Sequence, residues 1–193
     1  MEFGIPLTKF DPNHVRWGNP RLGPFRRTIP FAYEEGQIHF HSVILSLQPL
    51  KIVEMDIMRN QIILEESRKL SFLSKIEQFQ TLVQHSLLKH GAQWTEGCKK
   101  ATEVAIPLQP LLKNKRLCLY LSTQADSLSF FNEGVAVPFS DTSIKPGDLI
   151  RITVKLQGLS LQMVEDNIWT GKSRIQHHIL QIYKVSKDDD DFV

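Results

Sequence analysis

The residues of this sequence that could do chemistry are mainly cations beside aromatic rings. One such group lies in the segment WTGKS of residues 169–173, with Arg174 directly after it. An aromatic side chain can stack on a nucleic-acid base while neighbouring cations hold phosphate groups. The segment therefore has two interpretations. It is a hairpin tip that presents Trp169, Lys172 and Arg174 to nucleic acid, or it is a solvated turn whose tryptophan covers the core.

A second group of cations and aromatics lies near the N-terminus, in the stretch HVRWGNPRLGPFRR of residues 14–27. Interleaved basic and aromatic residues suit contacts with the phosphate backbone and with bases. The alternative is a segment that wraps its own domain and leaves its arginines in solvent. The candidate nucleic-acid contacts of this stretch are Arg16, Trp17, Arg21, Arg26 and Arg27, to which we add Lys155 and Tyr183 from the C-terminal half.

The WTGKS segment does not fit a Walker phosphate loop, and no catalytic or metal motif takes its place. The Walker pattern needs glycine at position 166, where the chain has Asp166, and strand-like residues follow where a helix should begin. No GxSxG, HExxH or supported Cys–His arrangement occurs. The pairs His39 with His41 and His177 with His178 lack further ligands at metal spacing. We therefore expect no catalytic residues, no metal and no cofactor.

The chain closes on a block of negative charge, KDDDDFV, in which four aspartates precede Phe192. Such runs are usually disordered, solubilising ends. However, the net charge of +2 rises to about +6 without these aspartates, so the rest of the chain is basic. The tail could then occupy a cationic groove of its own domain and, once displaced by nucleic acid, dock on another protein. The residues of this tail site are Asp188, Asp189, Asp190, Asp191 and Phe192.

The first half of the chain contains the elements that would position these residues. Residues 1–36 are rich in proline, glycine and arginine, which predicts an extended basic arm. Residues 37–47 alternate as a strand with a bulge, and 51–64 favour one or two short strands. The segment 65–90 has apolar residues at helical spacing and acidic residues in its first turn, which predicts a helix that ends at Gly91.

The second half is richer in strand patterns. Residues 116–122, 144–164 and 173–185 favour strands, with a bend expected at Gly158, and residues 127–139 favour a strand with a turn at 132–134. The order of arm, strands, one long helix, strands and tail predicts a mostly β or α+β fold. More specifically, it favours an OB-like antiparallel β-barrel over residues 37–186 with one long inserted helix, followed by an acidic tail at 187–193.

Composition sets wider limits. With 193 residues, 41% hydrophobic and 23% charged, the chain is typical of one globular domain with tails. Cys98 and Cys118 lack CxxC spacing, so we expect free thiols in a reducing compartment. The first residues, MEFGIPLTKF, do not form a signal peptide, and no apolar run is long enough to span a membrane. These features predict a soluble, intracellular protein of the nucleus or cytoplasm.

The C-terminal part resembles the single-stranded DNA-binding proteins of bacteria and phages, in which an acidic C-terminus with an aromatic near its tip follows a domain of OB type. The run GDLIRITVKLQGLSL, with the later IWTGKSRIQHHILQIYKV, is similar to the last OB strands in replication proteins of phages and large DNA viruses. The resemblance covers about the last forty to fifty residues. Here Val193 follows the aromatic, whereas bacterial tails typically finish on it. The resemblance implies a single-stranded DNA partner.

Together these features predict a non-enzymatic, sequence-tolerant single-stranded DNA-binding protein that acts in DNA replication, recombination or repair. Its acidic tail would regulate binding and recruit replication or repair proteins. RNA is an alternative ligand, and a homo-oligomer is compatible with this prediction. A second hypothesis is a structural or assembly protein that binds other protein chains through its arm and helix. A third is an enzyme of unidentified type.

Overall fold

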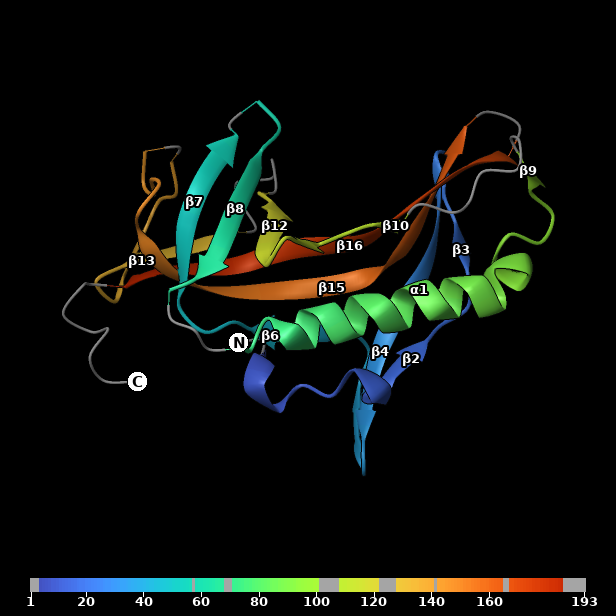
Figure 1. Cartoon of the computed structure of the whole chain (residues 1–193), viewed down its shortest axis with the longest axis horizontal. Helices are drawn as coiled ribbons and strands as arrows, with labels where there is room; N and C mark the ends of the chain where they lie inside the picture. The colour runs from blue at the N-terminus through green and yellow to red at the C-terminus, as the bar shows by residue number, and fades with distance from the viewer. Residues whose placement is uncertain are drawn as a thin grey trace.

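The computed structural model describes residues 4–56, 58–67, 71–100, 108–121, 128–140, 142–164 and 167–185. In these ranges the chain forms an open, mixed β-sheet and one long α-helix (Figure 1). The prediction of a mostly β, α+β fold is therefore confirmed.

Two long antiparallel strands, β15 (Leu149–Val164) and β16 (Ile168–Val185), form the spine of the sheet (Figure 1). Both were predicted as strands: β15 lies within the predicted range 144–164, whereas β16 begins before the predicted range 173–185. Three register shifts interrupt their pairing, one of them between Leu156 and Gly158, where the sequence predicted a bend. Bulges of this kind increase the local twist and redirect side chains, so the spine is bent along its length.

Three strands pair with one edge of β15. These are β4 (Arg26–Glu35), β6 (Val43–Ser46) and β7 (Leu50–Asp56), all antiparallel to it. Where β4 crosses, a Cβ atom at Gly158 would lie 2.4 Å from the carbonyl oxygen of Ile29. Only glycine allows such a close backbone approach, so the bend is also the docking point of β4.

The free edge of β16 pairs in parallel with β9 (Lys99–Lys100), β10 (Leu108–Gln109) and β13 (Ser129–Asn132). The last of these continues through a tight turn into β14 (Val135–Val137). Glu133 and Gly134 both have positive φ in that turn, as expected for a two-residue hairpin connection. The turn predicted at residues 132–134 is thus present.

Beyond β7, the sheet continues through β8 (Gln61–Glu66) to β12 (Arg116–Tyr120) and β11 (Leu112–Lys113). It curls until β12 lies close to β16, where the backbone N–H of Tyr120 donates to Nε2 of His177 at 2.8 Å. No backbone ladder joins β12 to β16 among the described residues. The curl therefore brings β12 and β16 together, but they lack the backbone hydrogen bonds that would close the sheet into a barrel.

The long helix is α1 (Ser74–Trp94), which begins and ends later than the predicted 65–90. Its start is displaced because Glu65 and Glu66 belong to β8, where they pair with Lys51 and Leu50. The Glu66 carboxylate instead accepts a hydrogen bond from the backbone N–H of Leu73 just before the helix, at 2.7 Å. The apolar stripe of α1 is buried in the core, through Ile76, Phe79, Val83 and Leu87.

The N-terminal segment belongs to the same core. It contains β1 (Ile5–Pro6), two 3-10 turns at Leu7–Lys9 and Pro12–His14, β2 (Val15–Trp17) and β3 (Arg21–Leu22), before β4 and its hairpin partner β5 (Ile38–Phe40). Phe10 is buried, with its ring 5.8 Å from that of Phe79. The described residues 4–36 are therefore part of the packed fold, and a separate extended arm is not found.

Arg27 ties this segment to the end of the helix. Its side chain is 7% exposed, and Nη1 donates to the carbonyl oxygens of Trp94 and Glu96, each at 2.8 Å. The last carbonyl groups of a helix have no partner within the helix and carry partial negative charge, so a buried cation stabilises them. Arg27, a candidate nucleic-acid contact in the sequence, thus has a structural role.

We predict that Arg27→Met lowers the free energy of unfolding by about 2–4 kcal/mol, because buried carbonyl groups lose a charged donor. The matched control is Arg26→Met, one residue earlier, where the side chain is exposed and the expected change is within about 0.5 kcal/mol. Urea denaturation followed by circular dichroism measures both. Equal losses in the two variants would contradict the proposed role of Arg27.

Candidate nucleic-acid interface

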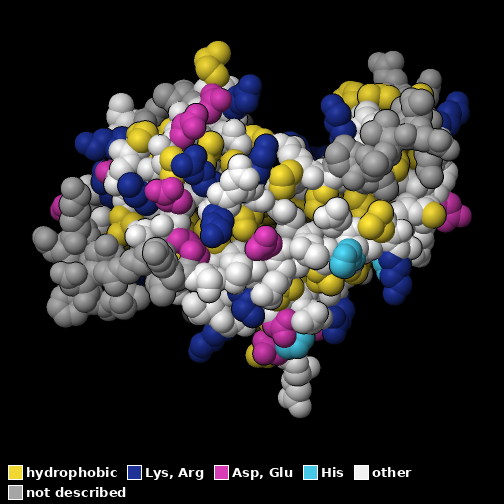
Figure 2. All heavy atoms as spheres, viewed as in Figure 1, with side chains coloured by type: hydrophobic (Ala, Val, Ile, Leu, Met, Phe, Trp, Pro, Cys, Tyr) yellow, Lys and Arg dark blue, Asp and Glu magenta, His cyan; other side chains and the backbone are white. Residues whose placement is uncertain are grey.

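A groove runs between the β7–β8–β12 side of the molecule and the side that carries β3 and β9. Figure 2 shows it as a notch with lysine and arginine side chains on both walls. It consists of two adjoining hollows of about 480 and 830 Å³, which share Gln109, Pro110 and Arg174. We call these two hollows together the basic groove.

Four cations line the basic groove: Arg26, Lys113, Lys172 and Arg174. They come from β4, β11 and β16, so three separate parts of the chain contribute. Neither hollow has an aspartate or glutamate among its described lining residues. Like charges gathered in a concave surface produce a strong positive potential, which attracts polyanions.

One end of the groove has an exposed aromatic side chain. Phe25 is 68% exposed and lies between β3 and β4, next to Arg26. Its backbone carbonyl accepts a hydrogen bond from the N–H of Met163, at 3.0 Å, which attaches this connection to β15. The ring is therefore held at the groove by the backbone while its surface is open to solvent.

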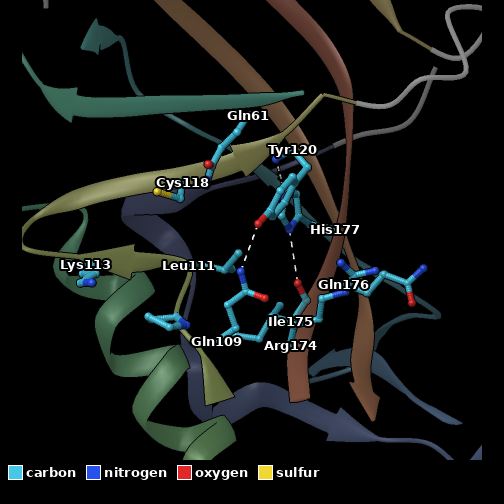
Figure 3. Close-up of a pocket in the computed structure, with 11 residues that line it drawn as sticks. Gln61, Gln109, Leu111, Lys113, Cys118, Tyr120, Arg174, Ile175, Gln176 and His177 are labelled. Atoms are coloured by element: carbon cyan, nitrogen blue, oxygen red, sulfur yellow. Dashed lines mark hydrogen bonds between the residues drawn. The ribbon is translucent and has the colours of Figure 1, made fainter. Parts of the chain in front are cut away.

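The opposite end of the groove is polar and well ordered by hydrogen bonds. Figure 3 shows Tyr120 and His177 beside each other, with ring centroids 5.8 Å apart. The amide of Gln109 donates to the Tyr120 hydroxyl at 3.0 Å. Aromatic and amide groups of this kind can face the bases and sugars of a nucleic acid, whereas the cations can face its phosphates.

His177 is held in its neutral form. Its Nε2 accepts the N–H of Tyr120, so the ring proton lies on Nδ1, which faces the carbonyl oxygen of Ile175 at 3.3 Å. Burial is the largest cause that lowers the pKa of His177, from 6.5 to about 4, and the charges of Arg174 and His178 act in the same direction. A second proton would also break the bond to Tyr120, which joins β12 to β16.

This shift predicts a loss of stability in acid. Above pH 6.5 the ring is neutral in both states, whereas between pH 6.5 and about 4 the unfolded chain binds a proton that the folded protein does not. The free energy of unfolding should therefore fall by up to about 1.4 kcal/mol per pH unit over this window. His177→Gln, whose amide oxygen can still accept from Tyr120, should remove this contribution. The measurement is urea denaturation at several pH values.

The decisive quantity is the difference between the wild type and the variant in how the free energy of unfolding depends on pH. His41→Gln, at an exposed position, is the control and should keep the wild-type pH dependence. If His177→Gln keeps the same slope as His41→Gln, His177 does not cause the acid sensitivity.

The structure brings three of the sequence-predicted contacts together in the groove, Arg26, Lys172 and Arg174. Arg21 is exposed on β3, near the end of the groove that has Phe25. Arg16 lies elsewhere, with Nε 3.2 Å from a carboxylate oxygen of Glu34. Lys155 and Tyr183 lie on the part of the β15–β16 spine beyond the groove.

Two predicted stacking residues pack inside the protein instead. Trp169 is 5% exposed, and its indole N–H donates to the carbonyl oxygen of Lys172 at 3.3 Å. The WTGKS segment is an irregular part of β16, with Gly171 at positive φ, and not a hairpin tip. The interpretation of Trp169 as an exposed stacking residue is therefore wrong. Of its alternative, a solvated turn whose tryptophan covers the core, only the buried tryptophan is found, because the segment is a strand.

Trp17 is likewise part of the packing. Its ring centroid lies 5.1 Å from that of Phe31 and 5.0 Å from that of Trp94. This half-buried ring joins β2 to β4 and to the end of α1, and so it is not an exposed platform for a base. The predicted tail residues 188–192 lie outside the described part of the chain.

The contacts predicted from the sequence did not include Lys113 or Tyr120, nor Phe25, although Phe25 lies in the predicted basic and aromatic stretch of residues 14–27. A signal existed for Phe25, because Gly23 and Pro24 precede it and favour a turn that exposes the ring. The other two carried no such signal, since only the curl of the sheet brings them to Arg174.

The described residues contain no cluster of histidine, cysteine and carboxylate side chains that could hold a metal ion. His39 instead contacts Glu34, with 2.9 Å between Nδ1 and the carboxylate, and Cys98 and Cys118 are free thiols. Within the same ranges, the helices are too short or too polar to cross a membrane.

No family model matches this chain, and no curated protein or solved structure is significantly similar to it.

Proposed function

We propose that this protein binds single-stranded DNA, without sequence preference, in the basic groove. The observation that carries the proposal is the set of four cations from three chain segments around a groove whose described lining has no carboxylate. Such an arrangement destabilises the free protein electrostatically, and a phosphate backbone would relieve the repulsion. Phe25 supplies an exposed ring for a base beside Arg26.

The strand order supports an OB-like interpretation of the curled part of the sheet. Taken in chain order, β7, β8, β12, β15 and β16 are five strands arranged as β12-β8-β7-β15-β16, with the first and last in contact through Tyr120 and His177. In OB-folds, nucleic acid lies across the second and third strands, between the loops that join strands one to two and four to five. Gln61 on β8 and Tyr120 on β12 both line the groove, which supports this comparison.

One feature departs from the usual OB arrangement. The helix α1 lies between the second and third of these strands, whereas OB-folds often have their helix between the third and fourth. The alternative hypothesis of an assembly protein is less favoured, because both features that suggested it, the N-terminal segment and the apolar stripe of the helix, are packed in the core.

We predict that affinity for single strands falls with salt, by about 0.7 in log K per unit of log salt concentration for each phosphate neutralised. Arg174→Glu should weaken binding at least about tenfold, or roughly 1.4 kcal/mol, because it reverses a charge where the two hollows meet. Fluorescence polarisation with a labelled oligothymidylate measures both effects.

Lys89→Glu is the matched control, since it makes the same change of net charge on the exposed surface of α1. It should alter affinity far less than Arg174→Glu. Equal effects of the two variants would show that net charge governs binding and that the groove does not. An affinity independent of salt would exclude phosphate contacts altogether. A labelled double strand and an RNA of the same length test the choice of ligand.

The acidic tail adds a regulatory part to the proposal. A tether gives the four terminal aspartates an effective concentration of order millimolar near their own domain, so even a weak contact with the groove would be populated. We propose that the tail competes with DNA in cis and, when displaced, recruits a replication or repair protein through Phe192.

We therefore predict that deletion of residues 188–193 raises the affinity for single-stranded DNA, most at low salt. Screening weakens the competing contact as the Debye length falls from about 30 Å at 0.01 M to about 10 Å at 0.1 M. Phe192→Ala is the control and should change DNA affinity little, because the aspartates supply the competition. If the shortened chain binds no better at low salt, the tail does not occupy the groove.

A further inference from the structure

A pair of aromatic rings, one exposed and one half-buried, lies at the other end of β16 from the basic groove. The rings of Phe131 on β13 and Tyr183 on β16 are stacked, with centroids 4.3 Å apart and an angle of 5° between their planes. Tyr183 is 36% exposed. Arg151, also exposed, lies directly opposite Tyr183 on β15. The cation and the two rings therefore form one row across three adjacent strands, which we call the distal platform.

A track of accessible side chains leads from the groove to this platform. Along β16 between Lys172 and Tyr183, the buried side chains are those of Ser173, Ile175, Ile179 and Ile182. Side chains alternate between the two faces of a strand, so the accessible side chains share the face opposite to these buried ones. The register shift between Thr153 and Val154 leaves one extra residue in β16, and the accessible side chains therefore stay on one face on both sides of it. The side chains on that face are, in order, the exposed Lys172 and Arg174, the half-buried Gln176, His178 and Gln181, and the exposed Tyr183.

This track has the chemistry of a nucleic-acid path. It begins at two cations of the groove, continues through amide and imidazole groups, and ends at a stacked aromatic pair, and none of its six side chains is a carboxylate. The distance from Arg174 to Tyr183 is roughly 30 Å at the rise of an extended strand. A ligand that bridges the two must therefore be a long, flexible polyanion, and a short oligonucleotide in the groove would not reach the platform.

We propose that the distal platform is a second contact site for the single strand held in the basic groove. The strand leaves the groove at Arg174, follows β16, and stacks a base on the Tyr183–Phe131 pair while Arg151 holds a phosphate. The class of ligand rests on the proposed function, but the platform itself is an additional site. The competing explanation is that the ring pair only fastens β13 to β16, as cross-strand aromatic pairs do.

Affinity as a function of ligand length separates these explanations. We use labelled oligothymidylates of about 4 and about 30 nucleotides, the first at the lower end of the roughly 4–16 nucleotides that a single OB-fold covers and the second well above it. Tyr183→Leu, which keeps apolar bulk and removes the ring, should weaken binding of the long strand about five- to tenfold and leave the short strand unchanged. Tyr183→Phe keeps the ring and should bind both strands as the wild type does.

The matched control is Phe40→Leu, since Phe40 is an aromatic of similar exposure, 40%, on the separate strand β5. It should change neither affinity. Ultraviolet crosslinking with mass spectrometry gives an independent readout. The peptide that contains Tyr183 should crosslink to the long strand and not to the short one.

The outcomes are distinct. If the wild type binds neither strand, the proposed function fails and the platform with it. If the wild type binds both strands but Tyr183→Leu weakens neither, or weakens both equally, the groove stands and the platform is overturned. A loss confined to the long strand, together with the crosslink at Tyr183, would support the platform.

Discussion

The antiparallel pairing of β15 with β16 is the interaction on which the rest of the structure depends. Every other part of the main sheet is attached to one of its two outer edges, directly or through a neighbouring strand. Strands on opposite edges come from sequence positions that are far apart, such as β4 and β10. Since a slip of one residue would exchange the buried and exposed faces of a strand, the rows of buried aliphatic side chains fix the register of the spine. The same register fixes where Lys172 and Arg174 point.

The groove exists because the curl of the sheet stops short of a closed ladder. Between its contacts with β10 and β13, the edge of β16 approaches β12 through the side chain of His177 and not through backbone pairing. A side-chain bridge holds two strands further apart than a ladder does, which leaves room for polar side chains and for a ligand. The stability of this seam depends on a histidine that must stay neutral, so the structure of the site is linked to pH.

Residues close together on one strand contribute separately to the core and to the groove. Arg26 and Arg27 are adjacent in β4, so their side chains point to opposite faces. One is exposed at the groove, whereas the other is buried against the end of α1. Trp169 and Lys172 show a similar division, because the buried indole bonds to the backbone of the residue whose ammonium group lines the groove. The cations can therefore repel one another without unfolding the site, since their buried neighbours hold the backbone.

The sequence by itself determined the classes of local structure. Alternation identified the strands of the spine, helical spacing identified α1, and the bend at Gly158 and the turn at residues 132–134 followed from glycine. It also supplied three of the four groove cations, because residue type limits the chemistry a side chain can do. Only the tertiary structure decided which of the cations and rings are accessible. Trp17, Arg27 and Trp169 have the same types as good nucleic-acid contacts, yet all three are used in packing, because burial depends on partners such as Trp94 that are distant in sequence.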